Sequence, residues 1–311
     1  MAGSVTPVDF STAPAYKPRI VEDLINFAID MKQNGKADAT IASRTRILRQ
    51  LAKMSDLRDP EQIKTILATR QTWNKRTRRR VAETYDAFLR FLGIKWTRPH
   101  YIPEDRIPFI PTEAEIDQLI AACGSHTATL LQTLKETGIR ISEATFLKWT
   151  DLSPEQKTLN ITPAKGSNPR LLRISDKLLN MLNRMPRTQE NIFSTNIASL
   201  RTTFAKTRKI AAEKLQNERI LRISFHTFRH WKATMEYHKT KDIIHVKQML
   251  GHKSINNTMI YINIEQALFL TEDVQWTCRT ANAPKQVTEL IEAGFEYVTE
   301  LDGLKFFKKR K

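Results

Sequence analysis

Residues 226–230 read HTFRH, and residues 250–261 read LGHKSINNTMIY. In the first stretch, His226 and Arg229 stand three positions apart, a spacing that puts both side chains on one face of a helix. In the second stretch, His252 follows a glycine and Tyr261 ends the run. Each pattern alone has an ordinary structural explanation. In this order along one chain, they indicate a site that combines a cation, imidazoles and a phenol.

A third stretch lies upstream, at residues 137–143, and reads TGIRISE. Its glycine ends a helical pattern, Arg140 follows shortly after, and Glu143 stands three residues further on. Between this stretch and HTFRH, two short β-like runs at 157–162 and 170–175 flank the turn PAKGSNP. We therefore expect a β-hairpin inside an otherwise helical domain.

The remaining segments differ in character. Four helical patterns precede residue 95, and the third has a capping pattern in which Asp59 stands before Pro60. The segment 96–111, WTRPHYIPEDRIPFIP, holds four prolines, which are excluded from a helix interior. We expect a flexible leader at 1–16, a small helical domain at 17–95 and a linker at 96–111. A second domain should follow at 112–270, and then an extension at 271–311 with a helix at 285–293 and a hairpin around Asp302-Gly303.

The charge of the chain indicates a polyanionic partner. The 50 Lys and Arg residues against 33 Asp and Glu residues give a formal net charge of +17. Five of these cations lie in KRTRRR at 75–80, at the start of a predicted helix, where the helix dipole disfavours them and an external anion such as a DNA phosphate would stabilise them. The predicted DNA-binding residues are Lys75, Arg76, Arg78, Arg79 and Arg80.

Several classes of protein are excluded. Cys123 and Cys278 lie far apart, with no metal-ligand spacing around them, which excludes a disulfide scaffold and a zinc site and suits a reducing compartment. No apolar run approaches the roughly 18–20 residues of a membrane span, and the first residues do not resemble a secretion signal. We expect a cytoplasmic, DNA-associated protein.

With these motifs in this order, residues 112–270 resemble the tyrosine recombinase family, the phage-integrase and Xer-like enzymes. TGIRISE is similar to the first arginine box of the family, HTFRH to its His-x-x-Arg box, and LGHKSINNTMIY to its Gly-His box and nucleophile. The resemblance implies that Tyr261 is the nucleophile, Arg140 and Arg229 clamp the phosphate, His226 and His252 bind phosphate or handle protons, Glu143 orders the site, and Lys165 in the hairpin turn is the leaving-group acid, with Lys157 and Arg170 near the same turn.

The resemblance also implies the fold and the activity. We expect a mainly α protein with small β-hairpins, in which a helical core-binding domain and a catalytic domain clamp duplex DNA. The implied activity is site-specific recombination or integration through a covalent 3′-phosphotyrosyl intermediate, without metal, ATP or another cofactor. The implied partners are double-stranded DNA and three further copies of the chain, as a tetramer on two synapsed sites, and the implied setting is a mobile genetic element.

The proposed chemistry explains the residue types. A phenol has a pKa of about 10, so Tyr261 is a poor nucleophile at pH 7 unless neighbouring cations stabilise its phenolate. Attack on a phosphodiester places negative charge on the non-bridging oxygens, and a guanidinium binds two such oxygens at once while staying charged. The leaving 5′-oxygen needs a proton, which a lysine ammonium or an imidazolium can donate.

Two alternative functions stay open. A type IB topoisomerase uses the same tyrosine chemistry and relaxes supercoils without requiring a particular site. A catalytically idle DNA-binding protein would keep the fold for an architectural role.

For the recombinase, the apolar residues after the tyrosine suggest a contact with a neighbouring subunit through Ile264, Leu268 and Phe269.

Overall fold

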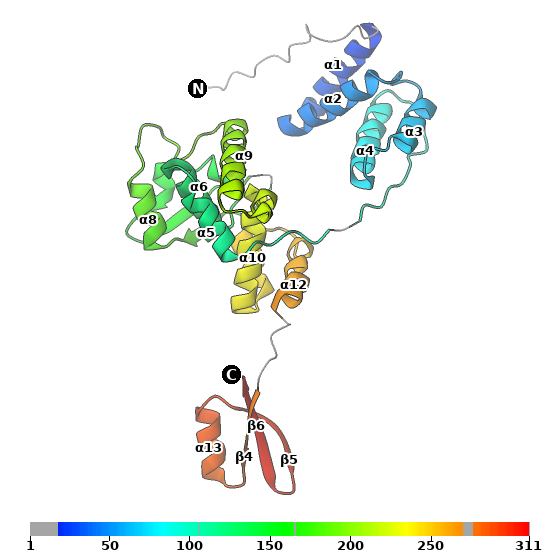
Figure 1. The fold of residues 1–311 in the computed structure, drawn as a ribbon. Coiled ribbons are helices and arrows are strands. Elements are labelled where there is room, and N and C mark those ends of the chain that lie inside the picture. Colours follow the sequence, from blue (N-terminus) through cyan, green and yellow to red (C-terminus); the bar gives the residue numbers. More distant parts are fainter. Residues whose placement is uncertain (1–17, 105, 165, 270–275, 311) are drawn as a thin grey trace. The chain divides into compact units, whose positions relative to one another are not determined.

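The computed structural model describes residues 18–104, 106–164, 166–269 and 276–310, and the chain passes from one compact unit to a second between Arg106 and Ile107 (Figure 1). The first unit consists of four helices that bury their apolar faces against one another. Tyr85 is fully buried there, and its hydroxyl donates to the carbonyl of Leu57 at 2.9 Å. The helices of this unit are α1 (Pro18–Gln33), α2 (Asp38–Ala52), α3 (Pro60–Thr69) and α4 (Lys75–Phe91).

Local capping explains where these helices begin. The Asp59 side chain accepts from the backbone N–H groups of Glu61 and Gln62, which confirms the expected start of α3. In the second unit, Thr112 and Glu115 form a capping box at the start of α5.

The proline-rich segment 96–111 has both ends attached to cores. Trp96 and Tyr101 pack against the core of the first unit, and the Trp96 indole N–H donates to Asp86 at 3.0 Å. Phe109 and Ile110 pack against the cores of the second unit. The free length of chain between the two units is therefore shorter than the sequence suggests.

The second unit contains a small sheet among helices. Its strands are β1 (Leu152–Ser153), β2 (Thr158–Ile161) and β3 (Arg170–Arg173), in the order β1-β2-β3. Antiparallel pairing of β2 with β3 confirms the expected hairpin. Strand β1 was not expected, because two residues carry no detectable alternation. The helices are α5 (Glu113–Ala121), α6 (Ser125–Thr137), α7 (Ile141–Ala144), α8 (Asp176–Asn183), α9 (Ile197–Lys214), α10 (Phe225–Thr240), α11 (Ile243–Leu250) and α12 (Asn256–Phe269), with short 3-10 turns η1 (Trp149–Asp151) and η2 (Glu218–Arg222).

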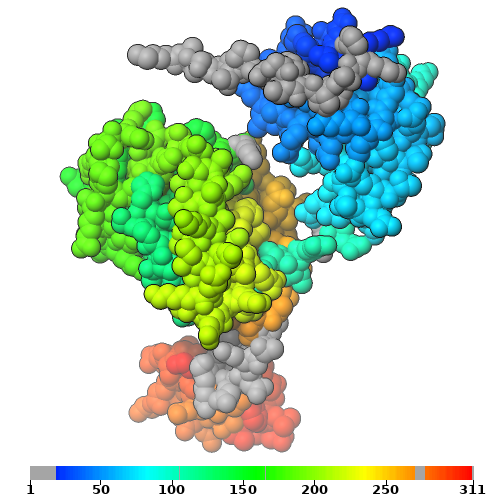
Figure 2. Space-filling view, turned by 45° about the horizontal axis from the view of Figure 1, so that its top comes forward, coloured from blue at the N-terminus to red at the C-terminus, as the bar shows by residue number. Residues whose placement is uncertain are grey.

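Helix α10 positions the candidate site because it packs against α6, α11 and α12. Phe228 on this helix is fully buried in the main core with Leu131 and Leu134 of α6. The same packing fixes the direction of the polar side chains on the neighbouring turns of α10. Helix α9, yellow-green in Figure 2, is largely exposed.

The extension after residue 275 is a three-stranded sheet with one helix. Its elements are β4 (Trp276–Ala281), α13 (Pro284–Glu292), β5 (Glu296–Leu301) and β6 (Leu304–Arg310), and the strand order is β4-β6-β5. The hairpin around Asp302-Gly303 is confirmed, with Glu300 opposite Lys305. Strand β4 was not expected. Among the described residues, no helix has the length and apolar character needed to cross a membrane.

Candidate active site

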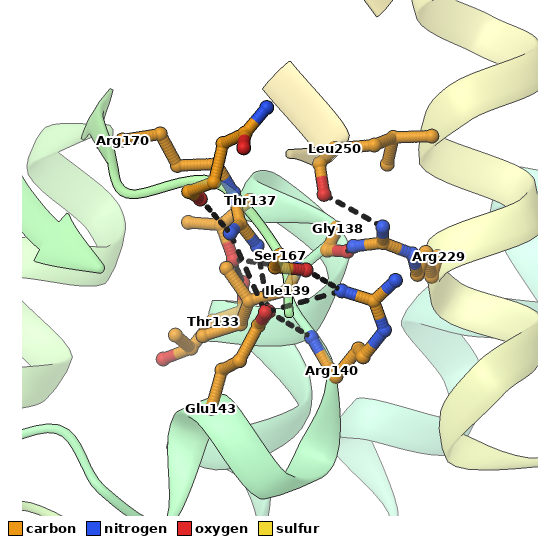
Figure 3. Close-up of polar contacts among 11 residues, drawn as sticks. Thr133, Thr137, Gly138, Ile139, Arg140, Glu143, Ser167, Arg170, Arg229 and Leu250 are labelled. Carbon is orange, nitrogen blue, oxygen red and sulfur yellow. Dashed lines mark hydrogen bonds and ion pairs between the residues drawn. The ribbon is translucent and has the colours of Figure 1, made fainter. Parts of the chain in front are cut away.

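Glu143 holds Arg140 in place at the start of α7. Helix α6 ends at Gly138, whose φ of 63° is left-handed, and the chain then turns into α7 with Arg140 as its N-cap. The buried Glu143 carboxylate accepts from the Arg140 backbone N–H at 2.9 Å and from its Nη1 at 3.2 Å (Figure 3). The expected ordering role of this carboxylate therefore has a direct geometric basis.

Arg170 is a second cation on the same carboxylate, and the sequence did not single it out for this place. Its side chain is buried, and its Nη2 donates to Glu143 at 2.6 Å (Figure 3). Burial acts to raise the pKa of Glu143, but the hydrogen bonds from Arg170 and the Arg140 backbone, with the charges of both guanidinium groups, lower it overall. Glu143 is therefore an anion between two cations.

Gly251 lies directly against this cluster. It ends α11 with a φ of 67°, and a Cβ atom there would stand 2.8 Å from Arg170 Nη1 and 2.9 Å from the Asn168 carbonyl oxygen. The Gly251 carbonyl also accepts from the Asn168 backbone N–H at 3.1 Å. A glycine is required here both by backbone conformation and by space.

Replacement of Gly251 by alanine should lower the free energy of unfolding of the second unit by about 3 kcal/mol, at the upper end of the strain of a left-handed non-glycine residue, because the added methyl also displaces Arg170. Gly35→Ala is the matched control, since Gly35 has a φ of 68° with no atom within 4 Å of an added Cβ. It should cost about 1 kcal/mol. Hydrogen exchange measures the stability of each unit separately. Equal losses of stability in the Gly251→Ala and Gly35→Ala variants would contradict the close contact between Gly251 and Arg170.

Arg229 is the most deeply buried cation of the site. Its side chain is 1% exposed, with Nη1 donating to the Gly138 carbonyl at 2.8 Å and Nη2 to the Leu250 carbonyl at 2.7 Å (Figure 3). Burial and the charge of Arg140 lower the pKa of Arg229 to about 9, so the group is charged at pH 7. Its two carbonyl contacts join the end of α6 to the end of α11.

The two predicted histidines lie in the same electrostatic environment. His252 is buried, and its Nδ1 lies 2.9 Å from the Thr258 hydroxyl. Burial, with the charges of Arg229 and Arg140, lowers the pKa of His252 to about 3. Partial desolvation of its ring, together with the same two charges, lowers the pKa of His226 at the start of α10, although part of this residue is exposed to solvent. His252 is therefore neutral at pH 7, and its expected role as a phosphate or proton-handling ligand stays a prediction.

Tyr261 lies on α12 and is 2% exposed. Burial raises the pKa of its phenol to about 12, while the charges of Arg229 and Arg140 act to lower it. The two arginines thus act in the expected direction, and burial outweighs them. The hydroxyl lies 3.1 Å from Nδ1 of His230, a residue that the sequence allows either to touch the site or only to support it. The structure therefore brings Tyr261 together with Arg140, Arg229, His226 and His252.

The leaving-group acid expected at Lys165 lies outside the described residues. Of its two neighbours, Lys157 lies at the far end of β2 from the turn and pairs with Asp176 at 2.7 Å, while Arg170 is bound to Glu143. Ser167, in the same turn, contacts Arg140 Nη1 (Figure 3). The described part of the turn is therefore attached to the site.

Four of the five predicted DNA-binding cations at the start of α4 have partners within the first unit, namely Lys75, Arg78, Arg79 and Arg80, and DNA binding by the five stays a prediction. Lys75 pairs with Glu104 at 2.8 Å, and Arg79 pairs with Glu83 at 2.9 Å. Arg78 is half-buried and donates to a backbone carbonyl at 3.2 Å, which is a structural role. The two ion pairs are exposed and therefore weak, so they are compatible with DNA binding.

The apolar residues after Tyr261 are less available for a subunit contact than expected. Ile264 is 2% exposed in the core of the second unit. The Phe269 ring stacks on His238 with centroids 3.8 Å apart. Of the three residues, only Leu268, which is 45% exposed, is available for the expected contact with a neighbouring subunit.

An open pocket of about 530 Å³ extends the site toward α9. Arg140, His226 and Phe225 line one part of it, and Arg201 and Arg208 of α9 line another. The part of the chain that the structure describes has no group of three or more His, Cys, Asp or Glu side chains placed to hold a metal ion. The pocket is basic and suits an extended anion.

Comparisons with known proteins agree with this geometry. The sequence model of the Phage integrase family matches residues 111–267. A putative integrase/recombinase, y4qK, from Sinorhizobium fredii is 30% identical over 139 residues, which cover 43% of this chain and 45% of that protein. A tyrosine recombinase from Thermosipho africanus is 28% identical over 165 residues, covering 51% of this chain and 58% of that protein. The chain thus spans about half the length of these curated relatives.

Solved structures share the fold at low sequence identity. A lambda integrase dimer bound to a COC′ core site has a TM-score of 0.60 and 17% identity, covering 78% of this chain and 94% of that chain. The Tn1549 transposon integrase in complex with transposon right end DNA has a TM-score of 0.60 and 14% identity, covering 80% of this chain and 99% of that chain. The mainly helical fold class with small sheets is confirmed.

Proposed function

Because this chain belongs to the Phage integrase family, we propose that it is a site-specific tyrosine recombinase that cuts and rejoins DNA strands through a 3′-phosphotyrosyl intermediate. One observation carries the proposal: Tyr261, Arg229 and Arg140 come from distant segments of the sequence, yet the charges of both arginines act on the Tyr261 phenol and favour its ionised form. This arrangement suits attack by a phenol on a phosphodiester.

The contacts of the site support specific roles. Arg229 has five N–H donors and uses two for backbone carbonyls, so others are left for a phosphate oxygen. Arg140, held by Glu143, provides a second guanidinium. His252 uses Nδ1 for Thr258, which leaves Nε2 for a phosphate oxygen or the leaving group. The family resemblance assigns the leaving-group proton to Lys165. Exchange of one phosphate ester for another is nearly isoenergetic, so ATP is not required.

The same proposal extends to DNA contact and assembly. We assign DNA contact to both units, through the exposed cations of α4 and through the basic pocket beside α9. One solved structure with a related fold is a lambda integrase tetramer bound to a Holliday junction, and its TM-score is 0.61. We propose that this chain acts as a tetramer on two synapsed sites. The proposal also places it in the cytoplasm and assigns it to a mobile genetic element.

Incubation with a library of nicked duplexes should yield a covalent protein–DNA adduct without metal or ATP. After cleavage beside a nick, the short 5′-hydroxyl fragment diffuses away, so the adduct accumulates and its DNA identifies the site. Peptide mapping should place the linkage at Tyr261, and Tyr261→Phe should form no adduct. Tyr237→Phe, on the neighbouring helix α10, is the matched control and should react normally.

Three outcomes would overturn the recombinase proposal. An adduct that persists in Tyr261→Phe would mean that another group is the nucleophile. Relaxation of supercoiled DNA without any site preference would favour a type IB topoisomerase, and site-specific binding without an adduct would favour a catalytically idle DNA-binding protein.

A further inference from the structure

His230 is the hydrogen-bond partner that the described residues provide for the Tyr261 hydroxyl. The distance from its Nδ1 to the hydroxyl oxygen is 3.1 Å, and the two rings are 5.9 Å apart between centroids. His230 lies on α10 and Tyr261 on α12, two helices that pack directly against each other. The contact is therefore a consequence of core packing and is shielded by the protein.

The direction of this hydrogen bond follows from the protonation states. Burial, together with the charges of His226 and Arg229, lowers the pKa of His230 to about 4, so the imidazole is neutral at pH 7. Burial raises the pKa of Tyr261 to about 12, so the phenol keeps its proton. With the proton of the imidazole on Nε2, the phenol donates to the lone pair of Nδ1.

We infer that His230 is a catalytic residue that accepts the proton of the Tyr261 hydroxyl during strand cleavage. The inference rests on the proposed function and names a group for which that proposal has no role. In the step, the phenol O–H bond breaks and its proton passes to Nδ1 of His230, while the phenol oxygen forms a bond to phosphorus. The bond from phosphorus to the 5′-oxygen breaks, and a separate acid protonates that oxygen. Religation runs these transfers in reverse.

The large difference in pKa between the two groups sets the timing of the transfer. A phenol with a pKa of about 12 does not ionise onto an imidazole with a pKa of about 4 before attack begins. As the phenol oxygen bonds to phosphorus, its proton becomes far more acidic than an imidazolium, so transfer becomes downhill during the attack. A bound phosphate also offsets the charge of Arg229, which lowers the basicity of His230 in the free protein.

His226 is less well placed for the same task. Its ring meets the His230 ring edge-on with centroids 4.5 Å apart, and it lines the basic pocket beside Arg140. Its position suits contact with the DNA phosphate. The two imidazoles of one helix therefore serve different atoms of the reaction, His226 on the substrate side and His230 on the nucleophile.

Replacement of His230 by asparagine tests this role, because an amide oxygen keeps an acceptor close to the position of Nδ1 but does not accept a proton. Cleavage of the nicked substrate at pH 7 should slow by about 10²–10⁴-fold, the usual contribution of a general base. Binding of a single DNA site should be unchanged. His245→Asn is the matched control, because His245 lies on the surface, pairs with Glu236 and should cleave normally. His230→Gln serves as a second variant if the asparagine variant is unstable.

The pH profile separates proton transfer from a merely structural role. Without a base, the phenol must lose its proton to solvent, so the cleavage rate of the variant should rise about tenfold per pH unit from pH 6 to 9. The wild-type rate should rise much less. If the variant is slower by the same factor at every pH, the contact is structural and the inference is overturned.

A substrate with sulfur in place of the 5′-bridging oxygen locates the defect. A thiolate leaves without a proton, so a defect on the nucleophile side persists with this substrate. Recovery of the wild-type rate in the His230 variants would place His230 on the leaving-group side and overturn the inference. Absence of any adduct from the wild-type protein would instead overturn the proposed function.

Discussion

Replacement of Arg229 by lysine should lower the rate of strand cleavage about 10²–10³-fold, the effect of removing one donor for the charge that develops in the transition state. The guanidinium spans two carbonyl oxygens, those of Gly138 and Leu250, from Nη1 and Nη2. A lysine ammonium is a single point and does not bind both carbonyls while also presenting a donor to a phosphate. Single-turnover cleavage of the nicked substrate measures the effect.

The same substitution should also destabilise the second unit. One buried carbonyl left without its donor costs about 1–3 kcal/mol, which urea unfolding measures. Arg187→Lys is the matched control, because Arg187 is exposed and stacks on Trp149, with 4.8 Å from its guanidinium carbon to the ring centroid. It should cleave at the wild-type rate. A normal cleavage rate in the Arg229 variant would mean that this cation only links α6 to α11.

The elements predicted correctly from sequence are those that short-range chemistry defines. The start of α3 at Asp59 and the hairpin turn at Asp302-Gly303 each depend on residues that are neighbours along the chain. Strand β4 was missed because its register depends on pairing with β6, which lies beyond α13 in the sequence. Local signals do not determine which distant segment completes a sheet.

The residues of the candidate site likewise fall into those that sequence patterns identified and those that only the fold revealed. Motif spacing identified Arg140, His226, Arg229, His252 and Tyr261, which the structure brings together. Arg170 and His230 required the fold, because their partners Glu143 and Tyr261 lie 27 and 31 positions away. The one available signal for Arg170 was a lone cation directly after the hairpin turn, and many surface cations occupy such places.

The cations of α4 show the limit of reasoning from charge density. The sequence places Lys75 and Arg79 in one dense run, but not the carboxylates that face them. Glu83 lies one helical turn from Arg79, which is readable, whereas Glu104 comes from the proline-rich segment. Lys75 and Arg79 are exposed and remain available to a phosphate, because exposed ion pairs are weak. DNA binding by these two cations therefore stays a prediction, although each has a carboxylate partner in the protein.

Glu143 should be the most important single contributor to the stability of the site, and Glu143→Gln should lower the free energy of unfolding by about 3–5 kcal/mol. Its side chain has no exposed surface, and it accepts from Arg170 and Arg140. A neutral amide leaves two like charges facing each other without a counter-ion. Glu190→Gln is the matched control, because Glu190 pairs with Lys148 at the surface and should contribute at most about 1 kcal/mol.

The pH dependence of the stability difference between wild type and Glu143→Gln shows whether the loss of a charge causes it. The folded-state pKa of Glu143 lies below the value of about 4.3 in an unfolded chain, so the unfolded state binds the proton more readily. The stability that Glu143 contributes is therefore fully present above pH 5 and is lost as the pH falls through the folded-state pKa. Urea unfolding of wild type and variant should differ by a constant amount from pH 5 to 8 and converge below pH 4. A difference that stays constant down to pH 3 would mean that lost packing, rather than the lost charge between Arg140 and Arg170, destabilises the variant.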